Sequence, residues 1–168
     1  DAVMLSAETA AGKYPIETVE QMAAIAQAAE QAEDVSLDAD FINKQFQRID
    51  QSIAMAALFT AHHLGCKAII ALTESGSTAL WMSRHKIHVP IFGLTAKSTS
   101  LHKMALYRNV RPLLVPNFTD RDEALAQAEA ILVARGVLMP GDTYAITCGE
   151  PMGHPGGTNM LKVCEVKA

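Results

Sequence analysis

The spacing of apolar and polar positions changes character at about residue 34 of the chain. Before that point, apolar side chains recur at helical spacing in an Ala-rich and Gln/Glu-rich stretch that begins with Pro15. Proline is favoured at the first position of a helix, so we predict a helix over 15–33. Residues 34–49 are acidic and irregular, and we interpret them as a linker.

After the linker, short apolar runs alternate with helical patterns. Asp50 is placed to cap a helix over 50–63. We expect strands at 68–72, 91–94, 111–115 and 143–148, and further helices up to about residue 85, over 96–107 and from 120 to 136. Strands separated by helices favour βαβ units, which build mostly parallel sheets. The predicted fold class is therefore α/β, a doubly wound three-layer sandwich around a mostly parallel five-stranded sheet.

The last predicted strand differs from the others in how it is connected. The residues between Cys148 and Met160 are few and rich in Gly and Pro, so they cannot form a crossover helix. The following stretch, 160–166, alternates apolar with polar positions. We therefore expect it to be an antiparallel edge strand of the sheet.

Composition narrows the class of protein. The chain has 168 residues, of which 49% are hydrophobic and 19% charged, and its formal net charge is -4. These values predict a folded domain and exclude a disordered tail, while the lack of a basic stripe argues against a nucleic-acid partner. No apolar run has the roughly 18 residues of a membrane span, so no membrane partner is expected. The three cysteines have no metal-ligand spacing, which predicts reduced, buried thiols and a cytoplasmic location.

The first residues suggest that the sequence is part of a longer protein. The chain opens at Asp1 directly on the apolar run 2–5, which has the pattern of a buried strand. A natural chain rarely starts inside such a pattern. We therefore expect that this piece is cut from something longer.

Loops rich in hydroxyl side chains and glycine follow the predicted strands. Ligands of open α/β sheets bind where the strands end at their carboxyl edge. The loops there are TESGST at 73–78, TAKS at 95–98 and GEPMGHPGGTN at 149–159. Free amides and hydroxyls can form a phosphate cage without a lysine, and the last loop can close over it. Ser and Thr also cap helices, and Gly and Pro also form turns, so a purely structural interpretation stays open.

Other reactive side chains give weaker signals. His62 and His63 are neighbours within one predicted helix and cannot face one ligand together, and no histidine has a partner at metal-ligand spacing. No base stands beside Cys148 in the sequence, and we expect no metal site. A phosphate cage without an acid and base pair points to binding rather than catalysis.

The order of several motifs resembles that of one enzyme family. The string DAVMLSAETAAGKYP at 1–15 resembles the motif that ends one βα unit in the catalytic barrel of pyruvate kinases. The resemblance continues through ALTESGSTALWMSR, VPIFGLT, ALYRNVRPLLVP, RGVLMPGDTYAITCGEPMG and PGGTN, and so covers essentially the whole chain. Ala7 and Ala11 make it similar to bacterial forms, because other members have Gly and Lys at these positions.

This resemblance implies a division of the chain. Residues 1–33 would be the terminal strand-turn and helix of a (β/α)8 barrel, 34–49 a linker and 50–168 the C-terminal allosteric domain. The parent enzyme would transfer phosphate from phosphoenolpyruvate to ADP in glycolysis, forming ATP, with Mg2+ or Mn2+ and K+. The family's catalytic and metal-binding residues precede the motif at residue 1, and Ser6 and Glu8 are remnants of the active-site end. We therefore expect this chain alone to need no cofactor and to have no kinase activity.

The resemblance also implies an effector site and a homo-tetramer. The expected effector-binding residues are Thr73, Glu74, Ser75, Gly76, Ser77, Thr78, Thr95, Gly153, His154, Gly156, Gly157 and Thr158. Glu74 stands where some animal forms regulated by fructose 1,6-bisphosphate have Lys, and no Arg lies near Ala124 to hold a second phosphate. Because a carboxylate repels a bisphosphate, we expect a sugar monophosphate or AMP as the effector. The predicted edge strand is a candidate contact between subunits.

Two other functions stay open at this point. The 73–78 loop is chemically similar to the S-x-S-G-x-T phosphate loop of sugar isomerase domains, which would make the chain a sugar-phosphate isomerase or sensor. His154 is then the only candidate catalytic base. A purely structural oligomerisation module with an empty site is the other alternative.

Overall fold

The computed structural model describes residues 2–32 and 45–167. The chain divides into two compact units, Asp1–Ser36 and Leu37–Ala168. Residue 33 and most of the predicted linker, residues 34–44, lie outside the described residues. No helix within the described ranges is long and apolar enough to cross a membrane.

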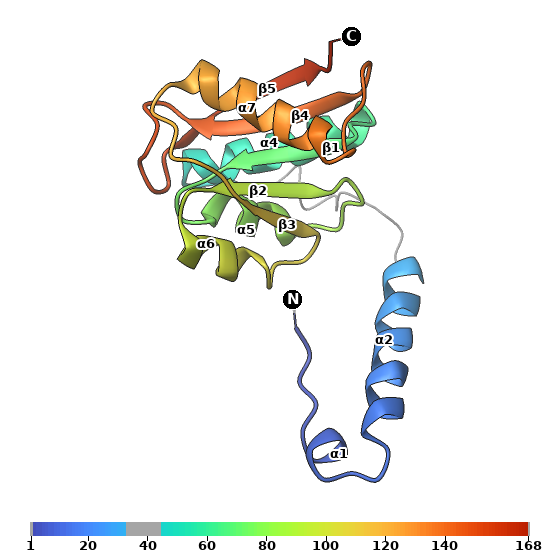
Figure 1. Ribbon diagram of the computed structural model, residues 1–168. Coiled ribbons are helices and arrows are strands. Elements are labelled where there is room, and N and C mark those ends of the chain that lie inside the picture. Colours follow the sequence, from blue (N-terminus) through green and yellow to red (C-terminus); the bar gives the residue numbers. More distant parts are fainter. Residues whose placement is uncertain (1, 33–44, 168) are drawn as a thin grey trace. The chain divides into compact units, whose positions relative to one another are not determined.

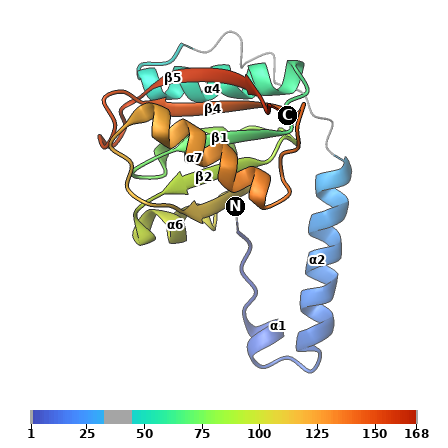
Figure 2. The ribbon, with the colours of Figure 1, turned by 45° about the horizontal axis from the view of Figure 1, so that its top comes forward.

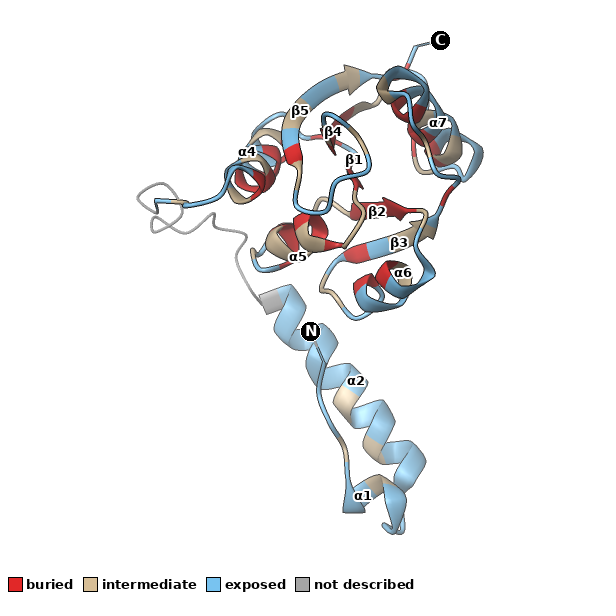
Figure 3. Cartoon of the chain, turned by 90° about the vertical axis from the view of Figure 1, so that its left-hand side faces the viewer, coloured by how far each residue is buried: buried red, intermediate tan, exposed pale blue. Residues whose placement is uncertain are grey.

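The first unit contains two helices, α1 (Ala7–Ala10) and α2 (Pro15–Ala32). Helix α2 matches the predicted one and starts at its proline. Residues 2–5, whose apolar pattern is that of a buried strand, have no regular structure, and Val3 is 72% exposed. A strand needs a neighbouring strand to satisfy its backbone groups, and the described part of this unit offers none. Figure 3 shows that this unit is almost entirely exposed.

The second unit contains the predicted sheet. Its strands are β1 (Ala68–Leu72), β2 (Ile91–Thr95), β3 (Val110–Leu114), β4 (Thr143–Gly149) and β5 (Thr158–Glu165). They lie in the order β3-β2-β1-β4-β5. All neighbouring pairs are parallel except β4 and β5, which are antiparallel. The α/β class, the mostly parallel sheet and the antiparallel edge strand are thus confirmed.

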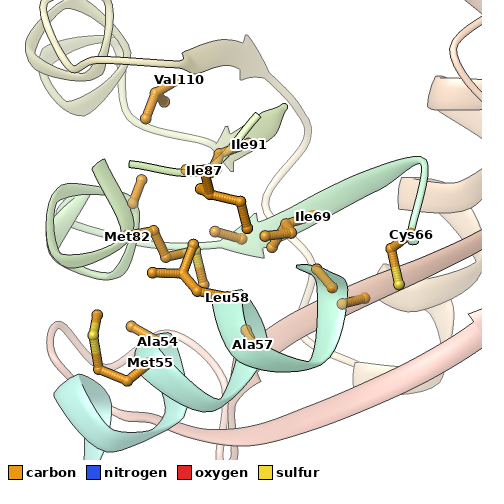
Figure 4. Packing of buried hydrophobic residues seen from close by; sticks show 14 of the residues in the cluster. Ala54, Met55, Ala57, Leu58, Cys66, Ile69, Met82, Ile87, Ile91 and Val110 are labelled. Carbon is orange, nitrogen blue, oxygen red and sulfur yellow. The ribbon is translucent and has the colours of Figure 1, made fainter. Parts of the chain in front are cut away.

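Helices cover both faces of this sheet (Figures 1 and 2). They are α4 (Ile49–His63), α5 (Ser77–Ser83), α6 (Ser98–Met104) and α7 (Arg121–Ala134). On one face Ile69 of β1 packs with Leu58 of α4 and Met82 of α5, as Figure 4 shows. On the other face Ile70 packs with the side chains of α7. Successive residues of a buried strand point to opposite faces, so β1 supplies both cores.

Two predicted helix boundaries are wrong in detail. Helix α4 starts at Ile49, and Asp50 is not its N-cap, because the Asp50 carboxylate is held by Arg48 at 2.9 and 2.7 Å. The helix expected over 96–107 is shorter, since the chain after Met104 forms tighter hydrogen bonds such as Tyr107 N to Met104 O. These bonds join residues three apart, as in a 3₁₀ turn.

The remaining features of this unit follow local chemistry. Asp120 caps α7 as predicted, since its carboxylate accepts a hydrogen bond from the Glu123 amide at 2.8 Å. All three cysteines are free thiols, but only Cys66 and Cys148 are buried, whereas Cys164 on the edge strand is half-buried. Burial raises the pKa of the Cys66 and Cys148 thiols, which favours their protonated and unreactive form.

Candidate functional site

A small cavity lies where β1 and β2 end and the β4–β5 loop begins. Its volume is about 40 Å³. Figure 3 looks toward this edge of the sheet and shows the β4–β5 loop in front of it. The cavity is lined by Leu72, Thr73, Glu74, Leu94, Thr95, Ala96, Val115, Pro116, Asn117, Phe118, Gly149, Met152, Gly153, His154, Gly156 and Thr158. The structure thus has a cavity at the carboxyl edge of the sheet, which is where ligands of open α/β sheets bind.

The loop over 73–78 is held in place by its own hydroxyl groups. Thr73 Oγ1 accepts a hydrogen bond from the Gly76 amide at 3.0 Å, and Ser75 Oγ donates to Ser77 Oγ at 3.1 Å. Gly76 has a φ of 82°, a left-handed conformation that glycine adopts without strain. Thr73 and Glu74 line the cavity, whereas Ser75, Gly76 and Ser77 do not. Helix α5 has only seven residues, and its N-terminus by itself does not indicate an anion site.

Thr78 and Thr158 form a buried pair beside the cavity. Their hydroxyl oxygens are 2.6 Å apart, and the two residues are 1% and 6% exposed. Thr158 lines the cavity but Thr78 does not. The pair therefore links the first turn of α5 to the first residue of β5, which starts two residues earlier than the predicted edge strand.

The loop after β2 holds Glu74 from its other side. Lys97 Nζ lies 2.8 Å from Glu74 Oε2. Ser100 Oγ donates to the Glu74 backbone carbonyl at 2.7 Å, and Ser100 is 5% exposed. Thr95 Oγ1 accepts from the Lys97 amide at 3.2 Å, which fixes the turn before α6. Glu74 thus has both its backbone and its side chain fixed by a segment that follows it by more than twenty residues.

The glycine-rich loop between β4 and β5 is anchored at its base. The Glu150 amide donates to Asn159 Oδ1 at 2.9 Å, and Asn159 Nδ2 donates to the Glu150 carbonyl at 2.6 Å. Arg121 of α7 adds an ion pair with Glu150 at 2.8 Å. A Cβ atom on Gly149 would lie 2.8 Å from the Gly157 carbonyl oxygen, so the two backbones approach too closely for a side chain.

The expected effector-binding residues are only partly brought together. Seven of them line the cavity, namely Thr73, Glu74, Thr95, Gly153, His154, Gly156 and Thr158, and five do not, namely Ser75, Gly76, Ser77, Thr78 and Gly157. Asn117 and Phe118 line the cavity but were not expected. They follow β3 as Ala96 follows β2, so the same carboxyl-edge rule was a signal that pointed to them.

The cavity offers hydrogen-bonding groups but little room. Its volume accommodates only a few water molecules, whereas ligand pockets usually measure about 300–1,000 Å³. A sugar phosphate therefore needs the β4–β5 loop to move outward. Glycine at 153 and 156, both with positive φ, gives that loop its freedom to do so.

Ser6 and Glu8, the expected remnants of an active-site end, lie at the start of helix α1 in the first unit. Ser6 Oγ donates to Glu8 Oε2 at 3.4 Å, and both residues are exposed. Hydrogen bonds from backbone amides lower the pKa of the Glu8 carboxyl. Within the described residues, no group of three His, Cys, Asp or Glu side chains could hold a metal ion. Ser6 and Glu8 are thus hydrogen-bonded to each other but, among the described residues, belong to no metal-binding group.

Comparison with known proteins points to one family. Residues 51–164 match the family model described as "Pyruvate kinase, alpha/beta domain". A pyruvate kinase of Buchnera aphidicola subsp. Baizongia pistaciae is 42% identical over 167 residues, which cover 99% of this chain and 35% of that protein. Pyruvate kinase II of Salmonella typhimurium is 40% identical over 168 residues, covering 99% of this chain and 35% of the relative. The chain thus spans about a third of the length of these relatives.

Proposed function

The chain belongs to the pyruvate kinase family, and we propose that residues 50–168 act as a regulatory domain that binds a phosphate-bearing effector. The observation that carries this proposal is the cavity at the carboxyl edge of the sheet. Thr73 reaches it from just after β1, Thr95 from the end of β2 and Thr158 from the start of β5, and a glycine-rich loop lines it. An effector acts only through different affinities for two states, which here are the closed and the opened β4–β5 loop.

The proposal includes the activity of the whole protein. We infer that it transfers phosphate from phosphoenolpyruvate to ADP in the cytoplasm, giving pyruvate and ATP, with a divalent metal and K+. Support comes from relatives named pyruvate kinase that match 99% of the chain. The described residues do not fit a metal site, so we assign no metal-dependent step to them. Residues 1–33 are proposed to be the terminal part of the catalytic barrel.

The expected absence of kinase activity in this chain is directly testable. Ser6 and Glu8 are exposed, and the described residues around them supply no metal site. The purified 168-residue chain should therefore not convert phosphoenolpyruvate and ADP in an assay coupled to pyruvate reduction. Turnover that persists after repeated purification would contradict this expectation.

The effector is proposed to be a sugar monophosphate or AMP. Among the described residues that line the cavity, none is Lys or Arg, and Glu74 adds a carboxylate. A second phosphate group would meet no cation in that lining.

Edge strand β5 is proposed to contribute to a homo-oligomer. Among the described strands it pairs only with β4, and Val163 on it is 41% exposed. An unpaired strand edge is suited to pairing with the same strand of a second copy around a two-fold axis. We retain the tetramer of the whole protein as part of this proposal.

Titration calorimetry separates the effector classes. The chain is titrated with ribose 5-phosphate, glucose 6-phosphate, AMP and fructose 1,6-bisphosphate under identical salt conditions. A monophosphate should bind most tightly. Tightest binding of the bisphosphate would refute the effector class, and binding of none would refute the regulatory site.

A further inference from the structure

The cavity poses an electrostatic problem for a phosphate ligand. Among the described lining residues Glu74 is the only carboxylate, and none is Lys or Arg. Glu74 is 21% exposed at its side chain, so water screens it incompletely. A phosphate dianion entering the cavity would therefore meet a charge of the same sign.

Lys97 supplies the missing positive charge from outside the lining. Its ammonium group lies 2.8 Å from Glu74 Oε2, and its side chain is 51% exposed. Because Lys97 does not line the cavity and is well solvated, its direct attraction for a bound phosphate is strongly screened. Its strongest electrostatic effect at the site is therefore on the Glu74 carboxylate, which it contacts.

Hydrogen bonds from Ser100 of α6 and to Thr95 of β2 fix the backbones of this ion pair. Ser100 holds the Glu74 carbonyl at 2.7 Å, and the Thr95 side chain holds the Lys97 amide at 3.2 Å. With both backbones held, the ion pair keeps the carboxylate on the α6 side of the cavity. Without Lys97 no ion-pair partner of Glu74 is left among the described residues, so its side chain can rotate and its charge is uncompensated there.

We propose that Lys97 positions and neutralises the Glu74 carboxylate, and so allows the cavity to accept a phosphate group. The inference rests on the proposed effector site and names a residue that acts on the ligand through another side chain. Lys97 is thus a positioning residue and not a phosphate ligand. An uncompensated carboxylate at the site should weaken phosphate binding by about tenfold to a hundredfold.

A mutant cycle tests this role. The affinities of inorganic phosphate and ribose 5-phosphate are measured by calorimetry for the 168-residue chain and for Lys97→Met, Glu74→Gln and the double variant. Lys97→Met should bind both ligands about tenfold or more weakly. Glu74→Gln should bind at least as tightly as the unchanged chain, and adding Lys97→Met to it should change the affinity by less than about threefold.

Two further variants serve as controls. Lys97→Arg keeps the charge and should retain the affinity, whereas Lys103→Met removes an exposed lysine of α6, the helix that Lys97 precedes, and should leave the affinity unchanged. Far-UV circular dichroism and thermal unfolding confirm that each variant is folded. An equal loss for Lys97→Met with and without Glu74→Gln would overturn the inference, because Lys97 would then contact the phosphate directly.

The remaining outcomes are also decisive. Unchanged affinity of Lys97→Met, with a chain that binds phosphate ligands, would refute the role of Lys97 and leave the effector site intact. If the unchanged chain bound neither ligand, the proposed regulatory site and this inference would both be wrong.

Discussion

The buried pair of Thr78 and Thr158 allows a quantitative test of how helix α5 is joined to strand β5. Replacing either residue by valine preserves the shape of the side chain but removes one hydroxyl from the 2.6 Å contact. A buried polar group that loses its partner costs about 1–3 kcal/mol of unfolding free energy. We expect each single variant to lose an amount of unfolding free energy within that range, and the two losses to be unequal.

The difference follows from what remains after each change. In Thr158→Val the Thr78 hydroxyl is stranded at a residue that is 1% exposed and does not line the cavity, so the loss should be about 2–3 kcal/mol. In Thr78→Val the Thr158 hydroxyl still faces a cavity with room for water, so the loss should be about 1 kcal/mol. Replacing both hydroxyls leaves no unpaired group, and the double variant should lose less than the sum of the single losses by about 1 kcal/mol or more.

Urea unfolding followed by far-UV circular dichroism measures all three variants. Thr99→Val, at an exposed position of α6, is the matched control and should change the unfolding free energy by less than about 0.5 kcal/mol. Strictly additive losses would refute the idea that the two hydroxyls satisfy each other. A larger loss for Thr78→Val than for Thr158→Val would refute the assignment of Thr158 to the cavity side.

Three further predictions concern the loop base, the core and alkaline pH. Gly149→Ala should weaken effector binding in calorimetry, because its Cβ would lie 2.8 Å from the Gly157 carbonyl oxygen and displace the β4–β5 loop; unchanged affinity would contradict this. Leu132→Ala should lower the urea unfolding free energy by about 2–5 kcal/mol, because Leu132 is fully buried against the sheet face that α7 covers. Burial and the hydrogen bond to Glu129 raise the pKa of Tyr144, so the folded state holds this proton more tightly. Stability should be retained below about pH 10 and lost as the pH rises above it, and Tyr144→Phe should reduce this loss in unfolding measured from pH 8 to 11.

Local patterns were sufficient to predict most of the fold. Runs such as 68–72 are too short for a helix and apolar at every position, which predicted a strand buried on both faces, and β1 is buried throughout. Asp120 was recognised as a cap because its effect depends only on residues within one helical turn. The apolar run 2–5 has the same local pattern, yet it forms no strand, because a strand also depends on a partner from elsewhere in the chain.

The candidate site was likewise predictable only in part. Its location followed from the sequence, since every parallel strand ends at the same edge of the sheet and the residues after each end must meet there. The directions of the side chains did not follow, and Thr78, expected in the phosphate cage, is instead bonded to a residue 80 positions away. Lys97, which the sequence placed only within a neighbouring loop, forms an ion pair with Glu74 at 2.8 Å.

The sequence alone therefore determined the elements, their layers and the edge at which a ligand could bind, because these depend on periodicity and on short connections. Only the tertiary structure decided which hydroxyls face the cavity, which charge is compensated and how far the glycine-rich loop closes. Those properties depend on contacts between residues that are distant in sequence. Examples are the hydrogen bond between α5 and β5 and the contacts of Lys97 and Ser100 with Glu74.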